Sequence, residues 1–164
     1  MTTNPADVWK PAQPTDELLS MTNEPLTDGM VRAVEQRIGQ ALPESYVTLL
    51  RTLNGGFVRN KRHPLVNGEI DSIWGIGRKA SSTVGSHDWS EELEHMRAQG
   101  ITEPRGLERM VPFAGDGHYF VCFDYNHLED AEPTIAFVDL ELHKPAVTVA
   151  KSFERFVSEL RAED

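Results

Sequence analysis

The sequence predicts an α+β domain with a mostly antiparallel sheet of about six strands, two N-terminal helices, one middle helix and a C-terminal helix. Three observations support this fold class. Residues 110–113 and 118–125 are rich in apolar side chains and flank the small residues 114–117, which is the pattern of two strands joined by a tight turn. The second strand is apolar on both faces, as expected in the middle of a sheet. Apolar residues also recur at helical spacing in four other segments.

The size of the chain favours one domain. Its 164 residues, 39% of them hydrophobic, are enough for one core and too few for two. We expect this domain at residues 26–161, after an irregular N-terminal arm at residues 1–25 that contains four prolines and shows little periodicity. Trp9, Leu18 and Leu19 are the sizeable apolar groups of the arm, and we expect them to hold it against the domain.

Residues 27–38 are predicted to form the first helix. Thr27 is of the type that caps helix N-termini, and Gly39 is typical of the residue that follows a helix. Pro43 fits the first position of a second helix, in which apolar residues repeat at helical spacing until the turn-forming residues 54–56.

The middle of the chain is predicted to contain two strands and a third helix. Residues 57–58 and 70–76 have the composition of strands. Asp88 then fits the N-cap of a helix with Glu91 at its third position, and Gly100 follows the last apolar residue of that helix.

The C-terminal part continues the sheet and closes with a helix. An acidic loop at residues 126–132 leads to strands at 134–139 and 146–149, and the short links between these strands imply antiparallel pairing. Ser152 is the predicted N-cap of the last helix. We expect Phe120 of the central strand and Phe153 of this helix to be buried.

The net charge of −10 argues against nucleic acid as a partner, because phosphate groups are held by clustered Lys and Arg. Residues 110–145 hold seven acids and the single base Lys144, which is −6 of that total. Such a surface keeps a protein soluble, and it is also a docking face for a basic protein. The candidate partner-binding residues in this segment are Asp116, Asp124, Glu129, Asp130 and Glu132.

Several patterns resemble catalytic or ligand-binding sites but lack a feature that such a site needs. The basic run at residues 59–63 is short and lacks interleaved aromatic residues, and residues 75–79 lack the spacing of a phosphate-binding loop. The six histidines are spread over loops, a helix and strand ends. Asp116, His118, Asp124 and His127 have side chains that bind metals, but they are spread along the strand and past its end. Cys122 lies in the middle of an apolar strand, where a buried thiol is expected and not a nucleophile. Ser86, His87 and Asp88 are adjacent in sequence, whereas a catalytic triad needs groups from separate positions. We therefore expect no enzyme activity, no metal and no cofactor.

Three segments, taken in order, carry a resemblance to a known family. They are LPESYVTLLRTLNGG at residues 42–56, VPFAGDG at residues 111–117 and AKSFERF at residues 150–156. This ordered set resembles the SUKH superfamily (Smi/Knr-like domain), which includes a fungal regulator of cell-wall synthesis and many bacterial immunity proteins. The resemblance extends over residues 25–160.

The resemblance implies a non-enzymatic protein-binding domain, in bacteria often an immunity protein that neutralises a cognate toxin, frequently a nuclease. The matching positions, which include the turn at residues 115–117, Asp124 and the pair Ser152 and Phe153, are mostly caps, turns and core, so they indicate the fold more than the binding site. The alternative is a regulatory or scaffolding domain of the same fold without a toxin partner.

The remaining expectations concern the surroundings of the protein. No apolar run approaches the roughly 18 residues that a membrane helix needs, and the N-terminus has no secretion signal. The single cysteine, Cys122, excludes an internal disulfide and fits a reducing compartment. We expect a soluble, cytoplasmic protein, a monomer or weak homodimer, whose partner is a basic protein such as a toxin domain.

Overall fold

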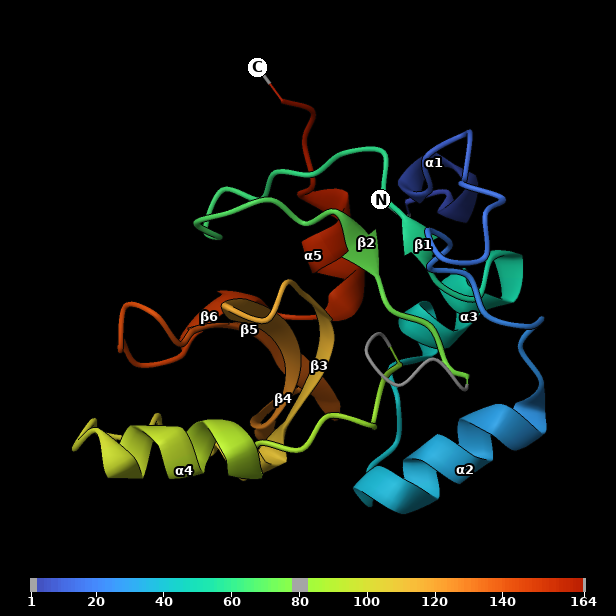
Figure 1. The fold of residues 1–164 in the computed structure, drawn as a ribbon. Helices are drawn as coiled ribbons and strands as arrows, with labels where there is room; N and C mark the ends of the chain where they lie inside the picture. The colour runs from blue at the N-terminus through green and yellow to red at the C-terminus, as the bar shows by residue number, and fades with distance from the viewer. Residues whose placement is uncertain (1–2, 78–82, 164) are drawn as a thin grey trace.

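The computed structural model of the chain describes residues 3–77 and 83–163. The helices of the described part are α1 (Pro5–Val8), α2 (Asp28–Ile38), α3 (Glu44–Thr52), α4 (Ser90–Ala98) and α5 (Phe153–Ser158). Its strands are β1 (Gly56–Phe57), β2 (Ser72–Ile73), β3 (Met110–Gly115), β4 (Tyr119–Glu129), β5 (Glu132–Asp139) and β6 (Val147–Ala150). The predicted α+β class is confirmed (Figure 1).

The strands form two antiparallel sheets and not one continuous sheet. The larger sheet has the order β3-β4-β5-β6, and β1 pairs only with β2. The predicted strand at residues 70–76 is reduced to the two residues of β2, because the chain then turns away from β1 and the backbone N–H of Trp74 donates to the carbonyl of Phe113 in β3, at 2.7 Å. The small sheet thus lies against the edge of the large one.

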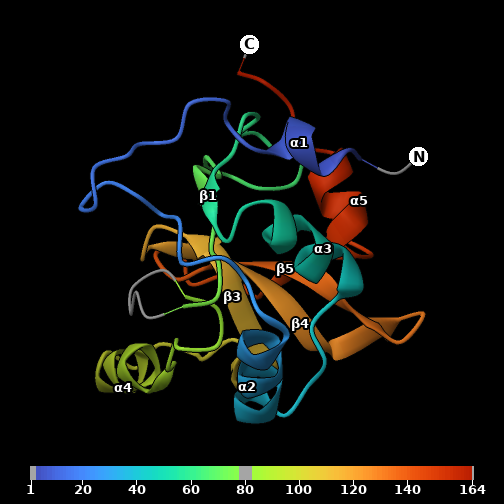
Figure 2. The same ribbon diagram turned by 90° about the vertical axis from the view of Figure 1, so that its right-hand side faces the viewer.

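The inner face of the large sheet is covered by α3 and α5 (Figure 2). Phe123 of β4 stacks on Phe113 at a centroid distance of 4.5 Å. The same ring meets Tyr46 of α3 edge-on at 5.0 Å and Phe153 of α5 at 5.9 Å. The Tyr46 hydroxyl donates to the backbone carbonyl of Trp74 at 2.5 Å, so this buried polar atom is paired. The predicted burial of Phe153 is confirmed.

The outer face of the sheet is covered over part of its area by α4 and the segment before it. Phe120 of β4 contacts the ring of Trp89 at 5.2 Å, and the Trp89 indole N–H donates to the carbonyl of Met110 at 3.0 Å. Figure 2 shows α4 on the side of the sheet opposite to α3 and α5. β4 lies between β3 and β5 and is buried on both faces over residues 120–125, which confirms its predicted central position and the predicted burial of Phe120.

Two of the predicted helix caps are present as hydrogen bonds. Thr27 accepts from the backbone N–H of Met30 at 3.2 Å, and Ser152 accepts from that of Arg155 at 3.1 Å. Gly39 ends α2 with a left-handed φ of 69°.

Two other caps differ from the prediction. Pro43 lies just before α3 as its N-cap and is not its first residue. Asp88 accepts from the backbone N–H of Ser90, but Trp89 is the N-cap of α4, so Glu91 is the second helical residue and the predicted capping box does not form.

The N-terminal arm is more ordered than predicted. It contains α1, and Trp9 is buried, with its indole N–H donating to Thr52 at 3.0 Å. The Gln13 side chain accepts from the N–H of Phe57 and donates to its carbonyl, at 2.9 and 2.7 Å, and so pairs, together with the backbone N–H of Lys10, the edge of β1 that faces the arm. Trp9 holds the arm as expected. Leu18 and Leu19 do not, because they are 95% and 63% exposed.

The basic run at residues 59–63 is largely neutralised by acids. Lys61 pairs with Asp71 at 2.6 Å and Arg62 with Glu69 at 3.4 Å. His63 is different, since its side chain is fully buried and its ring stacks on Phe156 at 4.8 Å. Its Nε2 lies 3.1 Å from a Glu159 carboxylate oxygen, and its Nδ1 accepts from the N–H of Leu65 at 3.2 Å. A neutral imidazole therefore satisfies both contacts, with Nε2–H as the donor to Glu159 and Nδ1 as the acceptor from Leu65.

This environment predicts a loss of stability at mildly acidic pH. Burial lowers the pKa of His63 below its usual 6.5, against an opposing effect of Glu159. The unfolded chain therefore takes up this proton at higher pH than the folded one, and the free energy of unfolding should fall as the pH drops below about 6.5. Urea unfolding at about pH 7.5 and about pH 5.5 measures this loss, which should be smaller in His63→Gln. The matched control is His127→Gln, since His127 is exposed and belongs to none of the ion pairs found in the described part of the chain. Equal losses in both variants would contradict the role of His63.

Candidate functional site

The most exposed acidic feature of the large sheet is the tip of the β4–β5 hairpin. Glu129 and Glu132 are directly opposite each other in the register, and Asp130 and Ala131 form the turn between them with φ of 48° and 66°. The predicted acidic loop at residues 126–132 is therefore wrong: β4 continues to Glu129 and the turn has two residues. Neither turn residue is glycine, so the usual sequence signal for such a turn is missing.

The tip combines carboxylates with an exposed apolar side chain. Leu128 is 56% exposed, Glu129 and Asp130 are also exposed, and Figure 2 shows the hairpin projecting beyond the helices. Like charges directly opposite each other in a sheet are unfavourable, as is a left-handed alanine. None of the ion pairs found among residues 3–77 and 83–163 involves Glu129, Asp130 or Glu132. The structure itself thus leaves this negative charge uncompensated.

A cleft of about 600 Å³ lies beside the hairpin, between α1, α3, α5 and the start of β5. We call it the acidic cleft, because Glu44 of α3, Glu132 of β5 and Glu154 of α5 line it without a basic residue among its described lining. The hydroxyl of Ser45, also in the lining, is buried and has no hydrogen-bond partner within the described part of the chain. The cleft therefore suits a cationic group that donates hydrogen bonds.

Sequence reasoning missed two members of this cleft, Glu44 and Glu154. Each lies in the first turn of a helix, where an acid is already explained by its favourable interaction with the helix dipole. Only the packing of α3 and α5 on one face of the sheet brings them to Glu132, so no local signal could have identified them.

The other two candidate partner-binding residues lie elsewhere. Asp116 is exposed beyond the opposite end of β4, and its carboxylate accepts from the backbone N–H groups of His118 and Tyr119 at 2.9 and 3.3 Å. Asp124 is only 2% exposed. A carboxylate buried to this degree does not form part of an open docking face, so Asp124 is not a contact residue of such a face.

The rejected catalytic patterns are not assembled in the described structure. Within residues 3–77 and 83–163, no group of three or more His, Cys, Asp or Glu side chains is placed to hold a metal ion. Burial raises the pKa of the Cys122 thiol, which disfavours the nucleophilic thiolate. Ser86 donates to the Thr83 carbonyl and His87 faces Glu92 at 3.3 Å, so these two residues do not form a triad. Residues 78 and 79 of the glycine-containing segment lie outside the described residues.

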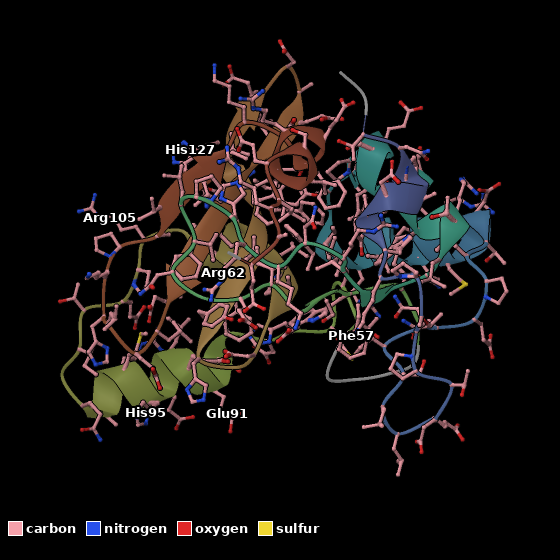
Figure 3. The ribbon with its side chains drawn as sticks, turned by 90° about the horizontal axis from the view of Figure 1, so that it is seen from above. Phe57, Arg62, Glu91, His95, Arg105 and His127 are labelled. Carbon is pink, nitrogen blue, oxygen red and sulfur yellow. The ribbon has the colours of Figure 1, made fainter. Side chains whose placement is uncertain are left out.

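The histidines are less scattered than predicted. His95 of α4, His118 and His143 line one groove of about 700 Å³ together with Glu91, Glu92 and Glu141. The Nδ1 of His118 lies 2.7 Å from a carboxylate oxygen of Glu141, and Figure 3 shows Glu91 and His95 together on one side of α4. The groove collects residues from three distant segments, which is why their spacing in the sequence did not reveal it.

The helices of residues 3–77 and 83–163 are all too short or too polar to cross a membrane.

Comparison with known proteins places these features in a family. No curated protein matched the chain. The sequence model of the SMI1 / KNR4 family (SUKH-1) matches residues 25–159, which include every helix and strand from α2 to α5. Domains of this family are generally protein-interaction domains of immunity or regulatory type. Because the match spans most of the chain, the chain belongs to the SMI1 / KNR4 family (SUKH-1).

Proposed function

We propose that this domain is a non-enzymatic immunity protein, which neutralises a cognate toxin by binding a basic surface of it at the hairpin tip and the acidic cleft. The observation that carries the proposal is the uncompensated charge of Glu129, Asp130 and Glu132 next to the exposed Leu128. Family membership supports a protein-interaction role. The toxin of such a pair is frequently a nuclease, and the basic surface of a nuclease is complementary to this charge.

The proposed site has the two parts that a specific interface needs. The carboxylates of the tip attract a basic surface and increase the association rate, and this effect weakens as salt screens the charges. Leu128, next to Glu129 in the same strand, offers an exposed apolar contact beside these charges. A Lys or Arg side chain of the partner that enters the acidic cleft would meet Glu44, Glu132 and Glu154 and would give the buried Ser45 hydroxyl a hydrogen-bond donor.

The proposal includes the cytoplasm as the site of action, in keeping with the single buried thiol of Cys122, and it includes no catalytic step. A regulatory or scaffolding domain of the same fold is the second candidate, because the family is of immunity or regulatory type. The two differ in gene neighbourhood, since an immunity protein is expected to be encoded next to its toxin.

Charge reversal at the hairpin tip tests the docking surface. The triple variant Glu129→Lys, Asp130→Lys and Glu132→Lys should associate with the toxin of the neighbouring gene at least about tenfold more slowly at low salt, because electrostatic steering becomes repulsion. The stability of the free domain should change little, since the reversal replaces the like-charge pair of Glu129 and Glu132 with another like-charge pair, and exposed charges add little stability. Stopped-flow association at several salt concentrations and thermal unfolding measure these effects.

A matched variant separates local charge from net charge. Glu91, Glu94 and Glu108 are exposed on α4 and on the 3-10 helix Leu107–Arg109, and their reversal to Lys changes the net charge by the same amount. This variant should slow association much less than the tip variant. Equal slowing by the two variants, or unchanged association in both, would show that the partner does not bind at the hairpin.

A further inference from the structure

A further pocket lies on the outer face of the large sheet. It has a volume of about 460 Å³, and we call it the outer-face pocket. Its floor contains the small side chains Ala136 of β5 and Thr148 of β6, and its walls are the segments at residues 102–105 and 143–146. Where β4 carries the large Phe120, Trp89 and α4 cover the same face. The small residues farther along the sheet leave the hollow open. It shares no described lining residue with the acidic cleft.

Two buried polar groups lie side by side at this pocket. Asp124 is 2% exposed and lines it, and Thr134 is 6% exposed and is the direct cross-strand partner of Asp124. Opposite residues of paired strands share a face, as do residues two apart on one strand, so Thr134 lies on the same face as Ala136 of the pocket floor. The two oxygen-bearing side chains are therefore neighbours on the face of the sheet that carries the pocket, and Asp124 is the one in its lining.

Neither group is fully satisfied by the protein. One oxygen of Asp124, Oδ1, accepts from the backbone N–H and the side-chain amide of Asn126 at 2.9 and 2.8 Å. No donor among the described residues reaches the other oxygen, Oδ2, and the buried Thr134 hydroxyl has no hydrogen-bond partner there either. A buried hydroxyl without a partner is unfavourable and rare and calls for an explanation, and the second oxygen of Asp124 is free to accept a further hydrogen bond. A ligand that donates a hydrogen bond to each of these two adjacent groups supplies such an explanation.

The rim of the pocket has the opposite charge. Arg105 and Lys144 line it, and neither belongs to any ion pair found in the described part of the chain. His127 and His143 also line it, while Glu103 is paired with Arg97. Figure 3 shows Arg105 and His127 on the same side of the molecule, away from α1 and α3. Unpaired cations around one pocket are unexpected on a chain of net charge −10. The pocket thus offers hydrogen-bond acceptors at its floor and positive charge at its rim.

We propose that the outer-face pocket binds a small zwitterion of the arginine type. The guanidinium group donates to Asp124 and Thr134, whose two neighbouring oxygens match its planar fork of N–H groups. The carboxylate of the ligand then lies at the rim, where Lys144 and Arg105 attract it. A volume of about 460 Å³ is within the range of roughly 300–1,000 Å³ that is usual for small-molecule sites.

Three probes of similar length test each end of the ligand. L-arginine has both charged groups, agmatine lacks the carboxylate, and L-citrulline replaces the guanidinium with a neutral urea. Isothermal titration should show that arginine binds and that agmatine and citrulline bind at least about tenfold more weakly, because each loses one charged contact. Absence of arginine binding to the wild-type domain at millimolar concentration, or equal binding of the three probes, would overturn the proposal.

Variants assign each end of the ligand to its residues. Asp124→Asn should abolish arginine binding, and Thr134→Val, which keeps the shape of the side chain, should weaken it. Lys144→Ala should reduce the affinity for arginine to the level of agmatine while leaving agmatine itself unaffected. Lys151→Ala, an exposed lysine outside the pocket, is the matched control and should bind arginine as the wild type does.

Because Asp124 also accepts from Asn126, thermal unfolding of each variant is measured in parallel. If Asp124→Asn does not fold, Thr134→Val and Lys144→Ala decide the question on their own. Unchanged arginine affinity in those two folded variants would place the ligand elsewhere. Binding of the toxin to these variants is expected to be normal, so failure of this proposal is distinct from failure of the proposed function.

Discussion

Phe153→Ala is expected to lower the free energy of unfolding by about 3–5 kcal/mol, the range for truncating a buried phenylalanine. Phe153 is buried in the core, with its ring 5.2 Å from that of Tyr46 and 5.4 Å from that of Phe113. The substitution removes a ring from the contact between α5, α3 and the sheet and leaves a cavity that these rigid elements cannot close. Such a loss is a large part of the roughly 5–15 kcal/mol that stabilises a typical domain.

Urea or thermal unfolding of the free domain measures the effect of Phe153→Ala. Phe120→Ala, on the outer face of the same sheet, should cost a similar amount, since Phe120 packs against Trp89 and Trp74. Leu18→Ala is the control for an exposed apolar residue and should change stability by less than about 0.5 kcal/mol. A negligible change for both phenylalanine variants would mean that β4 is not the centre of the core.

Asn54→Ala is expected to cost roughly 2–4 kcal/mol, because it leaves several buried backbone groups without partners. The Asn54 amide donates to the carbonyls of Glu24 and Ile76 at 2.6 and 2.8 Å, and its oxygen accepts from the N–H of Ile76 at 2.9 Å. One buried side chain thus connects the end of the arm to the segment that follows β2. Without it, these groups face an apolar interior.

Gly75→Ala tests the same contact from the other side. A Cβ at Gly75 would lie 2.3 Å from the backbone oxygen of Asn54, so alanine forces the two segments apart. Unfolding experiments should therefore show a loss of stability for both variants, and little change for Asn67→Ala, since Asn67 is exposed. A Gly75→Ala protein as stable as the wild type would contradict the close approach of these segments.

The features that the sequence predicted correctly depend on local interactions. Thr27 and Ser152 cap their helices because a hydroxyl needs only the backbone N–H three residues later. The central position of β4 was evident from its apolar side chains on both faces. The negative charge at Glu129, Asp130 and Glu132 was evident from the number of acidic residues in that segment of the sequence.

Other features were decided by tertiary contacts. Asp130 and Ala131 adopt left-handed conformations because the paired strands β4 and β5 hold them there, and for Ala131 this is against the intrinsic preference of the residue. Trp9 and Gln13 order the N-terminal arm only because α3 and β1 present a hydroxyl and a free strand edge.

By itself, the sequence determined the fold class, the Thr27 and Ser152 caps, the central strand, the family resemblance and the concentration of acids at residues 129–132. Only the tertiary structure decided that Glu44 and Glu154 join Glu132 in one cleft, that the strands divide into two sheets, and that Asp124 lies beside Thr134 beneath a pocket. The physical reason is the separation in sequence over which each interaction acts. Caps and periodic patterns act within a few residues and can be read from neighbours, whereas these sites join residues far apart in the chain, whose meeting depends on how whole helices and strands bury their apolar faces.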